Sequence, residues 1–225
     1  MTLLAFVSIF CAALFPAVHS ATDAARATAV KNKVRGIWIA ITSANTEREI
    51  NDLSPLWPGD LAKAGITFTT SEEYFTYLMS DGFNTKVIAP NIDDRLVWDL
   101  APGMLTAHGL KPATPGGPVL PENNAWHVAN IFDMSPAEVP FIVTRNAKAS
   151  ALAYPTQAEL DNRDVLIPLN AQTKPFGNTR VVWVSKGGAT MESRALHAFR
   201  AFICPLVKPD NAPALTVLPS EGGFK

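Results

Sequence analysis

Apolar residues fill the start of the chain almost without interruption. The segment MTLLAFVSIFCAALFPAV carries no charge, and the first formal charge is Asp23. As an α-helix, these roughly 18 residues would be about 27 Å long, just short of a comfortable bilayer span. Because the segment has no polar face, the helix would be apolar on every side.

An amphipathic pattern follows. Its apolar residues recur at spacings of four, three, one and three, which is one helical stripe: Val30, Val34, Ile37, Trp38 and Ile41. Asn45 and the later Ser54-Pro55 are expected to end the helix. We therefore predict one helix from about residue 1 to 43, roughly 65 Å long. The chain then divides into a stalk helix (1–44), with an apolar half (1–22) and an amphipathic half (23–44), and a globular head (45–225).

Three interpretations of the N-terminal segment compete. A cleaved secretory signal would end after Val18-His19-Ser20, but no Lys or Arg precedes the apolar run. A single-span anchor would tether a periplasmic enzyme or binding protein. A filament stalk is the interpretation we favour. It explains the uniformly apolar half, which would pack against copies of itself, and the amphipathic half, which would lie against its own head.

The segment resembles the type IV pilins and the pseudopilins of type II secretion systems. Met1-Thr2-Leu3-Leu4 fits the opening of a mature pilin, although Ala5 stands where the family has a glutamate. A second register, based on the spacing from Met1 to Pro16, fits better. That register places the glutamate upstream of Met1. The stretch RGIWIAITSANTERE, Trp57-Pro58, Arg145-Asn146 and VVWVSKGGA also resemble a large-headed pseudopilin-like group from Verrucomicrobia and Lentisphaerae, which adds no function.

The resemblance implies an α+β, pilin-like fold whose apolar half assembles with copies of itself. The residues expected to pack in a filament core are Met1, Leu3, Leu4, Phe6, Val7, Ile9, Phe10, Leu14, Phe15 and Val18. Pro16 is expected to break or kink the helix in the assembled state, because proline lacks a donor and clashes with the preceding turn. The stripe from Val30 to Ile41 would pack against the head.

Local signals predict the elements of the head. Thr70 and Glu73 form a capping box before a helix at 71–80, and a second helix is predicted at 122–131 with Trp126 facing inward. Residues 111–121 are predicted to be an exposed loop. Strands are predicted at 141–144, 164–169 and 180–185, with a further candidate at 214–218, while 192–203 could be helix or strand. An antiparallel sheet against the C-terminal half of the long helix would bury both apolar faces.

Composition and motifs reduce the number of function classes that fit the chain. With a net charge of −1 and a pI near 6.4, the chain lacks the positive charge that is typical of nucleic-acid-binding proteins. We therefore expect no nucleic acid as a partner. The four histidines are isolated in sequence, and Cys11 and Cys204 are not spaced for a metal. No nucleophile elbow, P-loop or dinucleotide fingerprint occurs. The sequence therefore predicts no enzyme and no cofactor.

Two acidic clusters are the only metal candidates. Asp93 and Asp94 lie in PNIDDR, and Asp161 and Asp164 flank Asn162-Arg163. Aspartate and asparagine commonly form turns by bonding to their own backbone, which is the interpretation we prefer. The alternative is a weak calcium site, although no matching loop spacing is visible.

These observations predict a structural filament subunit, either of a type IV pilus-like fibre or of a secretion pseudopilus. Its partners would be itself, the inner membrane before assembly, and the assembly machinery. The unassembled subunit would reside in the inner membrane, and the filament would be at the cell surface or, for a pseudopilus, in the periplasm. The alternative is a single-span membrane-anchored periplasmic binding protein or enzyme.

Overall fold

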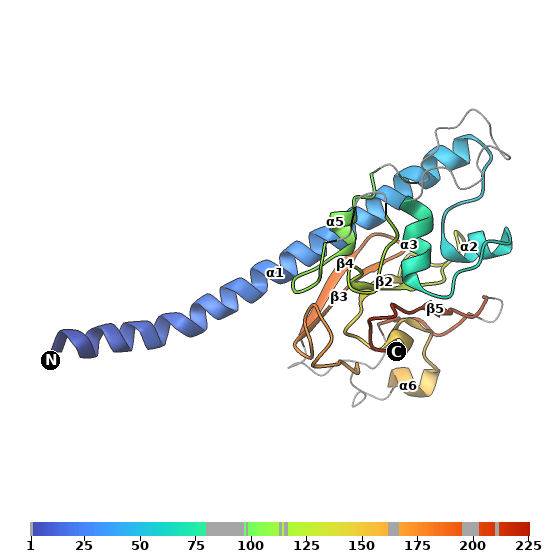
Figure 1. Cartoon of the computed structure of the whole chain (residues 1–225). Coiled ribbons are helices and arrows are strands. Elements are labelled where there is room, and N and C mark those ends of the chain that lie inside the picture. Colours follow the sequence, from blue (N-terminus) through green and yellow to red (C-terminus); the bar gives the residue numbers. More distant parts are fainter. Residues whose placement is uncertain are drawn as a thin grey trace.

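A computed structural model shows one long helix lying against an α+β head (Figure 1). It describes residues 2–79, 97, 99–112, 114, 117–161, 167–194, 203–209 and 212–225, with the backbone alone at residues 2–17, 19 and 160. Helix α1 spans Thr2–Ile50 and leaves the head toward the N-terminus. Within the described part of the chain, we find no helix with an apolar run long enough to cross a membrane.

The C-terminal end of α1 lies later than the sequence predicted. The helix continues past residue 43 to Ile50. Asn45 does not end it, because the Asn45 Oδ1 instead accepts a hydrogen bond from the Leu56 backbone N–H at 2.6 Å. The helix ends where Asp52 adopts a left-handed φ of 55°. There the Leu53 N–H bonds to the Arg48 carbonyl at 2.9 Å, closing a Schellman-type C-terminus.

The head contains a five-stranded antiparallel sheet in the order β4-β3-β2-β1-β5. Its strands are β1 (Trp126–Ala129), β2 (Pro140–Thr144), β3 (Arg180–Ser185), β4 (Thr190–Arg194) and β5 (Val217–Leu218). The C-terminal half of α1 packs across β3 and β4 (Figure 1). The predicted α+β class and the antiparallel sheet on this half of the helix are therefore confirmed.

The β3–β4 hairpin shows why the sequence folds locally as it does. β3 reads RVVWVS, a run of β-branched and aromatic residues that suits a buried strand. Lys186-Gly187-Gly188 then turns the chain, and Gly188 has a φ of 84°. A side chain at Gly188 would also collide with the ring of Trp38 on α1, so this turn can approach the helix only because it is glycine.

Short helices surround the sheet. They are α2 (Pro58–Lys63), α3 (Ser71–Met79), α5 (Pro102–Leu105), the 3₁₀ turn η1 (Ala149–Leu152) and α6 (Gln157–Asp161). α5 lies along α1, and η1 packs on β1, β2 and β5. The predicted capping box is confirmed, since the Glu73 N–H bonds to Thr70 Oγ1 at 3.3 Å and the Thr70 N–H bonds to Glu73 Oε2 at 3.4 Å.

Several predicted elements need correction. The helix predicted at 122–131 is wrong, because Trp126–Ala129 form β1, a strand paired on both sides and buried at every position. Trp126 does face inward, with no exposed surface. The strands predicted at 141–144 and 180–185 are confirmed as β2 and β3. Of the candidate strand at 214–218, only Val217–Leu218 form a strand. Leu169 makes an isolated bridge to Ala147, and residues 162–166 lie outside the described part. The segment predicted as helix or strand at 192–203 begins as a strand, because β4 covers Thr190–Arg194. Residues 195–202 lie outside the described part.

Candidate functional site

Helix α1 changes from exposed to buried at one point. Val18 and every residue from Ser20 to Arg26 are exposed, and Ala27 is the first to be buried, at 1% exposure. From there a stripe of small and branched residues faces the head with almost no exposed surface: Ala27, Val30, Val34, Ile37, Ala40, Ile41 and Ala44. Trp38, also predicted to lie on this stripe, is half-buried. Among the residues of α1 whose side chains are described, burial on the head therefore begins at Ala27.

Polar contacts fasten this part of α1 to the sheet. The Lys31 ammonium lies 2.9 Å from Glu192 Oε2 on β4, and Arg180 on β3 pairs with the other oxygen of the same carboxylate. Burial raises the pKa of Glu192, but its ion pairs with Lys31 and Arg180 outweigh that effect and leave the pKa lowered. The Trp38 indole N–H also donates to the Lys186 carbonyl at 2.7 Å.

Several polar side chains in the described, exposed part of α1 have partners within the helix. The Thr22 hydroxyl donates to the Val18 carbonyl at 2.8 Å, and the Thr28 hydroxyl donates to the Ala24 carbonyl at 3.0 Å. The first charges of the chain pair with each other, since Arg26 Nη1 lies 3.5 Å from Asp23 Oδ1. Burial of this surface against a partner would therefore leave these two hydroxyls with their hydrogen bonds intact.

The residues predicted to pack in a filament core lie mostly outside what the structure describes. Val18 is 58% exposed, and the side chains of the others, from Met1 to Phe15, are not described. The backbone of α1 passes through Pro16 as helix in this single chain. The break expected at Pro16 concerned the assembled filament, so it stays a prediction.

Only one of the four weak calcium candidates lies in the described part of the chain, so this site stays a prediction. Asp161 is exposed at the end of α6, where its Oδ1 accepts a hydrogen bond from Gln157 Nε2 at 2.9 Å. Asp93, Asp94 and Asp164 lie outside the described residues. Among the residues that are described, no group of three or more acidic, histidine or cysteine side chains could hold a metal.

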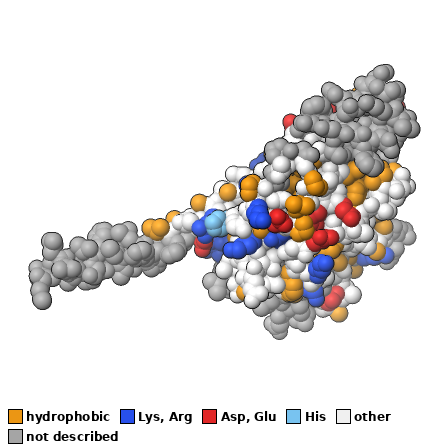
Figure 2. All heavy atoms as spheres, viewed as in Figure 1, with side chains coloured by type: hydrophobic (Ala, Val, Ile, Leu, Met, Phe, Trp, Pro, Cys, Tyr) orange, Lys and Arg blue, Asp and Glu red, His pale blue; other side chains and the backbone are white. Residues whose placement is uncertain are grey.

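A cleft of about 650 Å³ opens beside α3, and the sequence did not indicate it. Its apolar lining includes Phe68, Tyr77 and Leu120, and two loops and the C-terminal segment complete its walls. Three carboxylates also line it: Glu72, Glu73 and Glu221. Figure 2 shows apolar and acidic side chains next to one another on this face of the head.

Glu72 is the buried member of these carboxylates, with 5% exposure. Its Oε1 accepts hydrogen bonds from the Ser220 hydroxyl at 2.5 Å and from the Glu221 N–H at 3.2 Å. In sequence, Glu72 looked like one of two acidic residues in the first turn of a surface helix. Its partners lie almost 150 positions away, so no local pattern could have indicated its burial.

His127 and Ser220 lie in the same cluster, but they do not form a catalytic pair. His127 Nδ1 accepts the Ser220 backbone N–H at 2.8 Å, and Nε2 lies 3.1 Å from the carbonyls of Arg145 and Ala147. The Ser220 hydroxyl therefore points to Glu72 and not to the imidazole, and both Ser220 and His127 are fully buried. A substrate could not reach this hydroxyl, so the cluster anchors the C-terminal segment.

The imidazole must be neutral in the folded protein. Nδ1 has to accept a hydrogen bond, which leaves the proton on Nε2 for the two carbonyls. Burial lowers the pKa of His127 to about 4, and the carbonyls of Ala147 and Arg145 oppose this only in part.

Comparisons with known proteins found no match. No protein-family model, no curated protein and no solved structure matched the chain. The resemblance to pilins and pseudopilins thus rests on sequence motifs alone and stays a prediction.

Proposed function

We propose that the chain is the structural subunit of a filament, of the type IV pilus or type II secretion pseudopilus kind, which polymerises through the N-terminal half of α1. One observation carries the proposal. The helix continues toward the N-terminus well beyond Ala27, the last of its described residues to be buried in that direction, and the continuation from Thr2 to Thr22 is free of charge.

Apolar side chains are costly to expose to water, and this cost favours a partner that covers the segment. Each large apolar side chain gains about 1.5–3 kcal/mol when it is fully buried, and the segment holds many of them, from Leu3 to Val18. An isolated helix in water is also marginal without tertiary packing. Lipid would cover the segment before assembly, and neighbouring copies would cover it afterwards. Close packing between helices would supply the gain over lipid, whose tails are equally apolar.

The docked head suits a regular polymer. Lys31, Trp38 and the buried stripe hold α1 to β3 and β4, so the head keeps one orientation relative to the helix. Identical contacts repeated head-to-tail without closure build an open helical polymer. The subunit would start in the inner membrane and end in a filament at the cell surface or, for a pseudopilus, in the periplasm.

Microscopy of sheared surface material, followed by mass spectrometry, tests this proposal. The wild-type chain is expected in filaments, and Phe10→Lys should abolish them, because a charge would be buried among apolar helices. The matched control is Ile50→Lys, which puts the same charge on the same helix at a residue that is 78% exposed on the head. Filaments that persist in Phe10→Lys, or a wild-type chain that never polymerises in the producing cell, would overturn the proposal.

A membrane-anchored periplasmic binding protein is the second candidate, favoured by the cleft beside α3. In that case the N-terminal helix would serve only as a tether. Deletion of residues 1–22 separates the two functions. A binding protein should keep its ligand affinity as a soluble monomer, whereas a filament subunit should lose polymerisation.

A further inference from the structure

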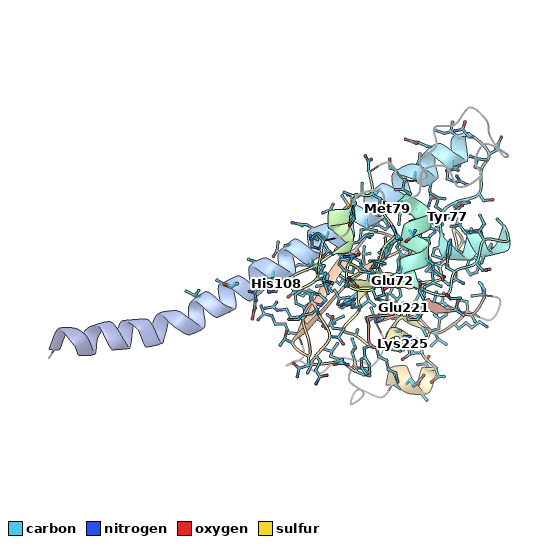
Figure 3. All side chains as sticks on the ribbon, viewed as in Figure 1. Glu72, Tyr77, Met79, His108, Glu221 and Lys225 are labelled. Carbon is cyan, nitrogen blue, oxygen red and sulfur yellow. The ribbon has the colours of Figure 1, made fainter. Side chains whose placement is uncertain are left out.

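The cleft beside α3 has a polar end and an apolar end. Glu72 and Glu221 lie together near the start of α3, and Tyr77 lies toward its other end (Figure 3). The helix rises about 7.5 Å between positions 72 and 77 at 1.5 Å per residue. At the apolar end the rings of Phe68 and Tyr77 are inclined at 54°, with centroids 5.4 Å apart, and Leu120 is 45% exposed.

The three carboxylates are not equivalent. Glu73 is occupied by the helix start, since its Oε2 accepts hydrogen bonds from the Thr69 N–H at 2.7 Å and the Thr69 hydroxyl at 2.9 Å. The backbone bond to Thr69 is the main reason why the pKa of Glu73 is lowered. Its negative charge therefore already stabilises the positive, N-terminal end of the α3 dipole. Glu72 is also in the first turn of α3, but the donors to its carboxylate are Ser71, Ser220 and Glu221 and not the N–H groups of the helix start.

Glu72 and Glu221 form no ion pair within the described part of the chain. Among the described residues, no lysine or arginine lies within ion-pairing distance of either carboxylate. Glu72 is nevertheless 5% exposed, and its Oε2 receives only long hydrogen bonds of 3.3 Å, from Ser71 and the Glu221 N–H. A buried carboxylate is ordinarily paired, because removing its charge from water is costly.

Two guanidinium groups near the cleft, one interacting with Glu72 and one with Tyr77, donate their hydrogen bonds to backbone carbonyls. Arg145 donates to the Pro121 and Lys174 carbonyls, and Arg48 Nε donates to the Ser54 carbonyl at 2.7 Å. Burial lowers the pKa of Arg145, and the charge of Glu72 only partly offsets this. Neither arginine lines the cleft, and among its described lining residues the charged side chains are all carboxylates.

We propose that this cleft binds a small organic cation with a flat apolar body, an arylalkylamine in type. The ammonium group would lie at Glu72 and Glu221, and the ring would lie against Phe68, Tyr77 and Leu120. The volume of about 650 Å³ falls in the range of small-molecule sites. A short alkyl linker matches the rise of α3 between the two ends. The proposal goes beyond the filament function and does not depend on it.

Calorimetric titration of the full chain in a non-ionic detergent tests the site, with 2-phenylethylamine as the probe. Its neutral analogue 2-phenylethanol has nearly the same shape and serves as the control for partition into detergent. The amine should bind at least about tenfold more tightly than the alcohol, since a hydrogen bond to a charged group exceeds a neutral one by that order. Half-molar salt should weaken the binding of the amine alone.

Two variants test the polar end and the apolar end of the cleft separately. Glu221→Gln keeps the shape of an exposed side chain and should weaken the amine about threefold or more, while leaving the alcohol unchanged. Leu120→Ala should weaken both ligands to a similar degree. Glu138→Gln removes the same charge from an exposed residue outside the cleft and should change neither.

Three results would overturn the proposal. The amine and the alcohol could bind equally, Glu221→Gln could leave the amine unaffected, or a lysine-containing peptide could bind where the amine does not. The last result would assign the cleft to a macromolecular partner.

Discussion

The two parts of α1 belong to one helix but have opposite surroundings. From Ala27 to Ala44, an apolar stripe is buried on the sheet, and polar side chains on the other faces meet water. From Val18 to Arg26, the described side chains are all exposed. The apolar pattern differs in the same way, because a stripe suits one flat partner, whereas an uncharged segment that is apolar all round suits partners on every side.

This difference shows where the folding free energy of the chain lies. The head and the docked half of α1 stabilise each other within one molecule. The described side chains before Ala27, Val18 and residues 20–26, are exposed and are not part of the core of the head. If the N-terminal half packs against lipid or other copies, as proposed, changes in the two halves should have separable effects.

The largest expected effect comes from a cavity under the docked half. Ile37→Ala should lower the free energy of unfolding by about 2–5 kcal/mol, because Ile37 is fully buried and the site cannot collapse completely. Ile39→Ala is the control, since Ile39 is 49% exposed two positions away, and it should cost under about 1 kcal/mol. Urea unfolding followed by tryptophan fluorescence measures both. Equal losses would show that α1 does not depend on this interface.

Acid should destabilise the head by a similar amount. The pKa of His127 is about 4 when folded and 6.5 when unfolded, so the unfolded chain binds more protons between these values. Stability should therefore be complete above about pH 6.5 and fall by about 3 kcal/mol as the pH drops to and below 4. The measurement is the urea midpoint as a function of pH.

Two histidine variants check the cause of that acid effect. His127→Gln should flatten the slope between pH 6.5 and 4, whatever its effect at neutral pH. His108→Gln, at an exposed position, should keep the slope. An unchanged slope in His127→Gln would assign the acid effect to the carboxylates instead.

A moderate effect is expected at the ionic link between α1 and the sheet. Glu192→Gln should cost about 1–3 kcal/mol, because Arg180, at 8% exposure, would lose the carboxylate that it pairs with. Chemical denaturation at low and high salt tests this. A variant as stable as the wild type would mean that water stabilises the Arg180 guanidinium as much as the Glu192 carboxylate does.

The smallest effect is expected on the exposed part of the same helix. Asp23→Asn breaks an ion pair whose side chains are 57% and 42% exposed, so it should change stability by less than about 0.5 kcal/mol. The same urea titration detects any larger loss. A loss comparable to that of Glu192→Gln would mean that the segment before Ala27 also contacts the head.

Local patterns in the sequence determined a good part of this fold. The stripe of Val30, Val34, Ile37 and Ile41 predicted which face of α1 is buried, because a helix repeats every 3.6 residues whatever it packs against. Thr70 and Glu73 predicted the start of α3, since the two residues that make a capping box are three positions apart. The β-branched runs of β2 and β3 predicted strands for the same local reason.

Tertiary structure alone decided the rest, because the deciding partners are distant in sequence. β1 is a strand and not the predicted helix because β2 and β5 supply its hydrogen bonds. α1 runs past Asn45 because that side chain bonds to Leu56 on the returning loop. Glu72 is buried because Ser220 and Glu221 lie against it, and the cleft exists because α3 meets two loops and the C-terminal segment. Periodicity tells which face a residue occupies, and only the folded chain tells what that face meets.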